Sequence, residues 1–140
     1  MAYAPNGDLK THHLTKNLLY VSIVIDVDAQ DDAATASQIT TNEVVEAIPV
    51  RAGDIVLQAG VFVRVACTGA ASGDVGTADL VNQFADGIAL DQTVATAYTA
   101  GGAPKLMTVA DTIDLKVLEA DVTAGLLEVW ALILRGTAKI

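Results

Sequence analysis

The sequence predicts an all-β protein, folded as an antiparallel sandwich or barrel. Apolar and polar residues alternate with a period of two in several short segments, which is the pattern of half-buried strands. About eight such segments follow one another, with turn residues roughly every ten positions, as is typical of antiparallel folds. Strands and helices do not alternate along the chain, and this disfavours a Rossmann-like sheet.

Length and composition agree with one folded domain. The chain has 140 residues, of which 52% are hydrophobic and 18% charged, so it has enough apolar material for a core. Only six residues are aromatic, and the apolar set is mainly Val, Ile, Leu and Ala, which pack well on a pleated sheet. We assign residues 1–17 to an extended N-terminal arm, because they are polar and lack a sustained period, and residues 18–140 to a single β domain.

The first half of the domain contains four predicted strands. Residues 18–28 alternate strictly, and the wholly apolar set is expected to face the core: Leu19, Val21, Ile23, Ile25 and Val27. Residues 29–42 form a loop with at most one helical turn. A strand at 43–50 ends near Pro49, and a turn at 51–54 leads to strands at 55–57 and 61–68. In the last of these, one face is expected to carry Val61, Val63, Val65 and Cys67.

The second half begins with weaker signals and ends with strong ones. Residues 69–76 (GAASGDVG) predict a flexible loop, and residues 77–84 (TADLVNQF) predict a short helix capped by Thr77, with Leu80, Val81 and Phe84 on one side. Short strands are expected at 88–90 and 106–109. Residues 112–118 direct Ile113, Leu115 and Val117 inward and Asp114 and Lys116 outward. A hairpin turn at 121–125 leads to 126–135, which is apolar on nearly both sides, as in a central strand.

No group of residues supports catalysis, and we predict a protein that is not an enzyme, has no cofactor and binds other protein surfaces. His12 and His13 are adjacent in the arm, so on an extended chain they point to opposite sides and are poorly placed to share a metal. A metal-dependent hydrolase on a β-barrel needs histidines on neighbouring strands instead. Asp26, Asp28, Asp31 and Asp32 lack the spacing of a calcium loop and are interpreted as a solvated strand end.

Two single residues have alternative interpretations. Cys67 is the only cysteine and lies in an apolar run, so a buried inert thiol is favoured over a nucleophile. Trp130 lies in the apolar segment near the C-terminal end, where core or subunit interface is favoured over a sugar-binding platform.

Charge and hydropathy restrict the partners. The formal net charge is −9, which repels phosphate backbones and anionic lipid, so we expect no direct binding to nucleic acid or membrane. Residues 1–16 contain no apolar core of a secretory signal, and the longest apolar stretch, 126–134, is too short to span a bilayer.

Three segments together resemble the small proteins that decorate or cement the capsids of tailed bacteriophages. They are IPVRAGDIVL at residues 48–57 with the strand after it, ADTIDL at 110–115, and AGLLEVWALIL at 124–134. The resemblance extends over residues 44–134, about two-thirds of the chain. It departs from the family's pattern at 77–84, where TADLVNQF replaces part of a glycine-rich middle.

The resemblance implies a β-sandwich of jelly-roll-like type that assembles as a homotrimer on the capsid exterior, after synthesis in the cytoplasm of a bacterial host. It also implies contacts that bridge neighbouring major capsid proteins and stabilise the capsid. For the capsid-binding residues we select those of the arm: Tyr3, Pro5, Leu9, His12, His13 and Leu14. The alternative is a receptor- or glycan-binding head or fibre module of a virion, because one sandwich fold serves many functions.

Overall fold

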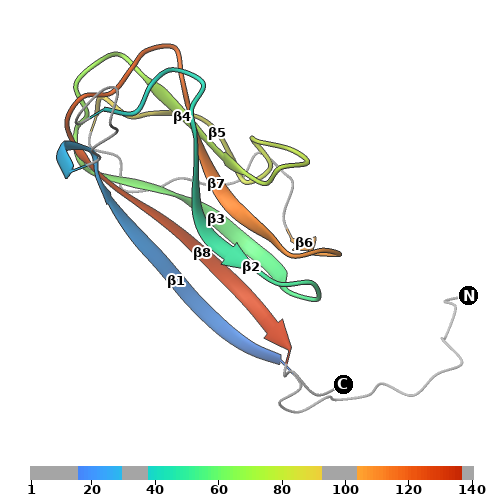
Figure 1. Ribbon diagram of the computed structural model, residues 1–140. Coiled ribbons are helices and arrows are strands. Elements are labelled where there is room, and N and C mark those ends of the chain that lie inside the picture. Colours follow the sequence, from blue (N-terminus) through green and yellow to red (C-terminus); the bar gives the residue numbers. More distant parts are fainter. Residues whose placement is uncertain (1–15, 30–37, 93–103, 137–140) are drawn as a thin grey trace, which may run out of the picture.

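Two four-stranded antiparallel sheets pack face to face in the computed structural model, which describes residues 16–29, 38–92 and 104–136 (Figure 1). The predicted antiparallel β-sandwich is confirmed. Within these ranges the only helical element is a single 3₁₀ turn, η1 (Val27–Ala29). The strands are β1 (Lys16–Asp26), β2 (Val44–Val50), β3 (Ile55–Val65), β4 (Ser72–Gly76), β5 (Ala85–Ala89), β6 (Lys105–Leu106), β7 (Asp111–Leu118) and β8 (Leu126–Gly136).

The strand pairing is nested. β1 pairs with β8, β2 with β7, β3 with β6 and β4 with β5, as if one long hairpin had been folded over into two layers. The strand order is β1-β8-β3-β6 in the first sheet and β2-β7-β4-β5 in the second. β1 and β2 therefore lie at the same side of the sandwich, and β8 lies between β1 and β3, as predicted for a central strand.

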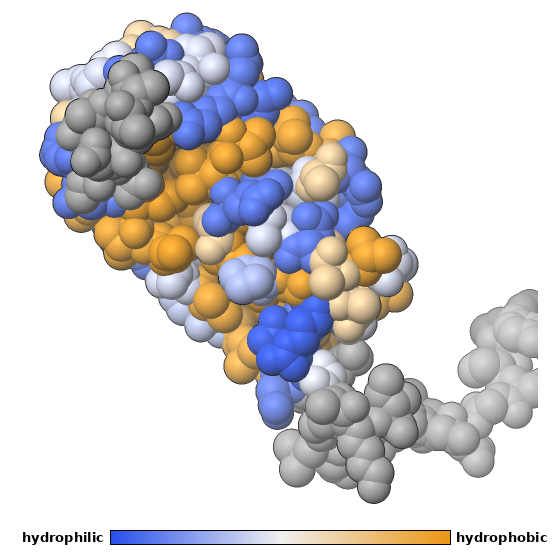
Figure 2. Space-filling view, in the orientation of Figure 1, coloured by the Kyte–Doolittle hydropathy of each residue, from blue (hydrophilic) through white to orange (hydrophobic). Residues whose placement is uncertain are grey.

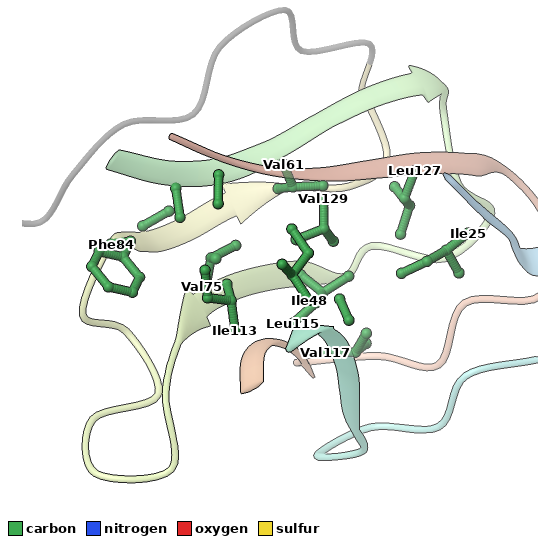
Figure 3. Packing of buried hydrophobic residues seen from close by; sticks show 14 of the residues in the cluster. Ile25, Ile48, Val61, Val75, Phe84, Ile113, Leu115, Val117, Leu127 and Val129 are labelled. Atoms are coloured by element: carbon green, nitrogen blue, oxygen red, sulfur yellow. The ribbon is translucent and has the colours of Figure 1, made fainter. Parts of the chain in front are cut away.

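The core lies between the sheets and is filled by alternate residues of the central strands (Figure 3). Ile113, Leu115 and Val117 of β7 are fully buried, as the alternation of residues 112–118 predicted. They face Leu127 and Val129 of β8, which are also fully buried. Burying such aliphatic side chains contributes about 1.5–3 kcal/mol each, so this layer is the main source of stability.

The inner residues of β1 point towards the second sheet as predicted, but not all of them are buried. Ile25 is buried and Val27 just beyond the strand is fully buried, whereas Ile23 keeps 43% of its surface exposed. Val21 is only partly buried against the core. The cause is position, because β1 is an edge strand and the second sheet covers only part of its inner face.

β3 is one continuous strand rather than the two predicted. The expected break at residues 58–60 is absent, and an irregularity between Val56 and Gln58 absorbs the change of register instead. A second irregularity, between Val63 and Val65, rotates the strand end so that Val65 is 55% exposed. The prediction that Val65 shares the buried face of Val63 was therefore wrong, whereas Cys67 is buried as expected.

Residues 69–84 differ most from the predictions. The expected flexible loop contains β4, in which Ser72 to Gly76 are all buried. The expected helix at 77–84 is a series of turns, closed by hydrogen bonds from the Thr77 and Gln83 N–H groups to the Leu80 carbonyl. The turns fold back closely over β4: the backbone of Leu80 and Val81 occupies the place where a Cβ at Gly76 would lie, so the approach requires glycine there.

The turn predicted at residues 51–54 is confirmed, whereas the hairpin predicted at 121–125 is wrong, because β7 and β8 belong to different sheets and the segment between them crosses from one sheet to the other. Gly53 adopts a φ of 92° in the turn between β2 and β3, a conformation that glycine adopts without strain. Gly125 precedes β8 with a φ of 129°, and a Cβ there would lie 2.7 Å from Cys67 Sγ. None of the described residues belongs to a helix that meets the length and hydropathy of a membrane span.

Candidate interaction surface

The outer face of the first sheet is mostly apolar, and we call it the apolar face. The register places alternate residues of β1, β8, β3 and β6 side by side on it. Leu18 is 61%, Tyr20 57%, Val24 56% and Leu106 58% exposed, and no described element lies over them. Five further apolar side chains of this face are half-buried: Ile55, Phe62, Leu126, Leu132 and Leu134.

Three aromatic rings form a stack across the apolar face. The Trp130 ring lies between Tyr20 and Phe62, with centroid distances of 6.3 Å and 5.6 Å and interplanar angles of 17° and 18°. The residue paired with Trp130 on β3 is Gly60, so no side chain competes with the indole at that position. The stack ties β1, β8 and β3 together on the side away from the core.

A charged pair continues this stack. The Arg64 guanidinium lies 4.7 Å from the Phe62 ring centroid, in the geometry of a cation–π contact. Arg64 Nη2 also donates to Glu128 Oε1 at 2.7 Å. The hydrogen bond from Arg64 lowers the pKa of Glu128, against a smaller opposing effect of desolvation. The apolar face therefore has a polar group at its β3 side as well as large apolar side chains.

Trp130 is 9% exposed, and both faces of its indole are covered by neighbouring rings. Sugar recognition on a tryptophan uses a free ring face, so this arrangement does not favour a sugar platform at Trp130. Its Nε1–H is buried and has no hydrogen-bond acceptor among the described residues. The sequence interpretation of Trp130 as core or interface agrees with its burial.

The outer face of the second sheet has the opposite character, and we call it the carboxylate face. Glu46 of β2 pairs in register with Asp114 of β7, and Asp74 of β4 pairs with Lys116. Asp86 and Asp111 contribute further negative charge to Asp74 and Asp114 respectively. The outer side of the first sheet is thus apolar, whereas that of the second carries carboxyl groups, of which those of Glu46 and Asp86 are exposed and those of Asp74 and Asp114 are buried.

Burial raises the pKa of both central carboxyls of the carboxylate face. Asp74 is 5% and Asp114 6% exposed, and desolvation is the largest effect on each. Neighbouring carboxylates raise the pKa further: Asp86 acts on Asp74, and Asp111 and Glu46 act on Asp114. Hydrogen bonds from Gly87 N–H to Asp74 (2.8 Å) and from Thr112 Oγ1 to Asp114 (2.6 Å) offset this only in part.

Replacing Asp74 and Asp114 with asparagine is expected to stabilise the fold at neutral pH, by about 0.5–1 kcal/mol each, the usual gain from removing an unfavourable charge. The pKa of each carboxyl is raised in the fold, so its ionisation lowers the free energy of unfolding. That free energy is therefore highest below the unfolded pKa, where both carboxyls are protonated, and falls as pH rises through the folded pKa. The gain should therefore shrink towards acid pH. Urea unfolding of wild type and variant between pH 3 and pH 8 measures it.

Asp121→Asn is the control. Asp121 accepts hydrogen bonds from Thr41 N–H (2.7 Å) and Thr41 Oγ1 (2.8 Å), and these bonds lower its pKa. Removing this charge should therefore not stabilise the protein at neutral pH. A gain at Asp121 equal to that at Asp74 and Asp114 would contradict the explanation based on burial and like charges.

A buried ion pair fixes the end of the sandwich where β2 turns into β3. Asp54 is 2% exposed and accepts from Arg135 Nη2 at 2.7 Å, from Arg135 Nε at 3.0 Å and from the Arg51 N–H at 2.9 Å. Burial alone raises the pKa of Asp54, but these hydrogen bonds and the charges of both arginines outweigh it, so the pKa is lowered. The pair connects the β2–β3 turn to the last strand.

Only some of the residues that the sequence analysis considered for binding or chemistry lie in the described part of the chain. The arm residues Tyr3, Pro5, Leu9, His12, His13 and Leu14 lie outside the described residues, as do Asp31 and Asp32. Asp26 ends β1 and Asp28 lies in η1. No group of three or more metal-ligating side chains occurs within residues 16–29, 38–92 and 104–136. Desolvation raises the pKa of the buried Cys67 thiol to about 11, which agrees with an inert cysteine.

The apolar face was not identified from the sequence. Only the inner residues of β1 were assigned to a face from the sequence, although Leu18, Tyr20 and Val24 on its other side are large and apolar. That excess of apolar residues on the other side was the available signal, together with the apolar residues on both sides of 126–134.

Comparison with known proteins supports the fold. No protein-family model matches the sequence, and no curated protein does. Among solved structures, the chain is similar to one in the capsid asymmetric unit of cyanophage Pam1, with 16% identity, a TM-score of 0.58, and 95% of this chain and 94% of that chain covered. A second similar chain, with 18% identity, a TM-score of 0.44, and coverage of 86% of this chain and 92% of that one, comes from an acid-stable capsid structure of Helicobacter pylori bacteriophage KHP30.

Proposed function

We propose that this chain is a structural protein of a bacteriophage virion that decorates the capsid exterior and stabilises it by bridging major capsid proteins. The observation that carries the proposal is the polarity of the sandwich, with a large apolar face on one sheet and carboxylates on the other. A sandwich of this kind can bury one side against a protein shell and leave the other in water. No enzymatic activity and no cofactor belong to this role.

The similarity in fold supports the same role. The matching Pam1 chain is of nearly the same length, because about 95% of each chain is covered, and it belongs to a capsid asymmetric unit. The nested pairing of β1–β8, β2–β7, β3–β6 and β4–β5 supports the jelly-roll-like sandwich implied by the resemblance to capsid decoration proteins.

The mechanism is the burial of apolar area at many copies of one contact. Each Å² of apolar surface removed from water contributes about 25 cal/mol, so a modest contact repeated around a shell becomes a large total. Tyr20 and Phe62 supply rings that are held by stacking on Trp130 and so lose little conformational entropy on binding, as the anchors of protein interfaces do.

The proposal also includes the predictions that the described residues leave untested. The arm, residues 1–17, would add contacts to the capsid through Tyr3, Pro5, Leu9, His12, His13 and Leu14, beside a single sandwich domain at 18–140. Synthesis in the host cytoplasm and assembly as a homotrimer follow from the resemblance. The net charge of −9 supports the expectation that neither nucleic acid nor membrane is a direct partner.

The test compares purified particles with and without this protein. Particles that lack it are expected to release DNA at a lower temperature and to break more readily under osmotic shock and chelator, and adding back the chain should restore resistance. Electron microscopy should place it at regular positions on the shell. Particles that withstand all three treatments equally well without it would exclude a stabilising role.

Surface variants test whether the apolar face is the side that contacts the capsid. Tyr20→Ser with Leu106→Ser removes exposed side chains from two edges of the apolar face, and is expected to reduce the copies bound per particle by about tenfold or more. Val44→Ser with Val109→Ser is the matched control, because these residues are 42% and 62% exposed but lie outside that face. Equal binding by both variants would show that the apolar face does not contact the capsid.

The glycan- or receptor-binding alternative is distinguished by a glycan array. The coverage of both Trp130 ring faces counts against it. Clear and saturable binding to one glycan class, combined with particles that are equally stable without the protein, would favour it over decoration.

A further inference from the structure

β1 is a long edge strand without the features that normally prevent edges from pairing. It forms eleven consecutive pairs with β8 and has no bulge, and no described strand pairs with its other side. From Asn17 to Ile25 it contains no charged residue and no proline. Such an edge exposes backbone donors and acceptors in a regular row, and is a template for adding another strand.

The other three edges are each protected. β6 has only two residues, and β3, whose edge continues beyond it, is interrupted by register shifts between Val56 and Gln58 and between Val63 and Val65. β2 carries Pro49 and a register shift between Glu46 and Ile48. β5 has five residues, a register shift opposite it and Gly87 at a φ of 67°. The difference between β1 and the other sheet edges indicates that the free edge of β1 is available to pair with a partner strand.

β1 is also partly exposed on both of its faces. On the outer side Leu18, Tyr20 and Val24 are more than half exposed, and on the inner side Ile23 is 43% exposed. Figure 2 shows hydrophobic surface on the visible side of the molecule, along the line that β1 follows in Figure 1. An added strand would cover apolar side chains on both faces at once, besides satisfying the backbone.

We propose that the partner is a second copy of this chain, with β1 pairing antiparallel to β1 of that copy about a two-fold axis at Val21. In this register Val21 faces Val21, Leu19 faces Ile23 and Leu18 faces Val24, so apolar residues meet on each face. A parallel pairing in register would instead place Asp26 opposite Asp26 of the other copy, and like charges directly opposite each other are destabilising.

This contact goes beyond the capsid role and is independent of it. It would join two first sheets into one eight-stranded sheet and double the area of the apolar face. If a trimer also forms, the two contacts together give six copies.

The first test is the mass of the purified full-length chain by light scattering. Wild type is expected at two copies, or six if trimers also form, and Leu18→Lys with Val24→Lys should halve the mass, because each new positive charge faces another across the axis. Leu18→Lys with Val24→Glu should restore it, since the new charges then attract. Both changes lie at exposed positions, so circular dichroism should show an unchanged fold.

Leu106→Lys with Val109→Lys is the matched control. These residues are 58% and 62% exposed and lie away from β1, so the same change in charge should leave the mass unaltered. A control variant that halves the mass, or a wild-type chain that remains a single copy at about 100 µM, a concentration far above the Kd of a stable complex, would overturn the proposal.

A cross-link tests the register itself. Val21→Cys places two thiols on directly opposed residues, whose Cα separation of about 4.5–5.5 Å suits a disulfide. Leu19→Cys places them four residues apart along the strands, about 13 Å, where no disulfide can form. Oxidation should therefore link Val21→Cys chains and leave Leu19→Cys chains single. Equal linking of the two, or none at Val21, would exclude this register.

Discussion

Replacing Arg135 with methionine is expected to lower the free energy of unfolding by about 3–5 kcal/mol, the usual cost of leaving one member of a buried ion pair without the other. Asp54 would remain, 2% exposed, and among the described residues it would keep the hydrogen bond from the Arg51 N–H at 2.9 Å and the charge of Arg51. Methionine retains most of the aliphatic packing of Arg135, so the loss reports on the charge. Urea unfolding at pH 7 measures it.

The effect should depend on pH in a defined direction. The pKa of Asp54 is lowered in the fold, so its contribution is present above the unfolded pKa of about 3.8 and is lost as pH falls through the folded pKa. Without Arg135, burial raises that pKa, and the carboxyl takes up a proton at a higher pH. The difference in stability between wild type and Arg135→Met should therefore be largest at neutral pH and narrow on acidification.

The second ion pair serves as a control. Arg64 and Glu128 lie 2.7 Å apart, as Arg135 and Asp54 do, but the side chain of Arg64 is 50% exposed. Exposed pairs contribute about 0–1 kcal/mol, so Arg64→Met should cost far less than Arg135→Met and show a weaker pH dependence. Losses of similar size would show that burial is not what makes the Asp54 pair important.

The sequence predicts strands well where side chains alternate and poorly where backbone or register decides. β7 and β8 were located within one or two residues, because every second side chain is a large aliphatic one. β4 was missed because SGDVG has a single large apolar residue and two glycines. It is held as a strand by its pairing with β5 and β7, and not by the strand propensity of its residues. Val65 was misplaced because a bulge leaves no mark in the pattern of residue types.

The candidate surface was harder to predict than the fold for a physical reason. A strand that is apolar on both sides indicates that both faces are covered, but not by what. In β8 the inner set, such as Val129 and Ile133, is buried by the second sheet. The outer set, such as Leu132 and Leu134, is covered by no described element. Only the assembled layers show that this second apolar side remains for a partner.

Truncating Phe84 to alanine is the other substitution expected to have a large effect, a loss of about 3–5 kcal/mol in the free energy of unfolding. Phe84 is fully buried just before β5, and its N–H donates to the Val75 carbonyl at 2.8 Å. Figure 3 shows its ring at one end of the core, near Val75. Alanine would leave a cavity there, because the neighbouring strands are held by their ladders and cannot close over it.

The comparison with Leu80→Ala separates the observed turns from the predicted helix. In a helix over residues 77–84, Leu80 and Phe84 lie one turn apart on the same face, and truncating either should be costly. In the structure Leu80 is 50% exposed, so its truncation should change the stability by no more than about 0.5 kcal/mol. Thermal and urea unfolding of the two variants measure both values, and comparable losses would favour the helix over the series of turns.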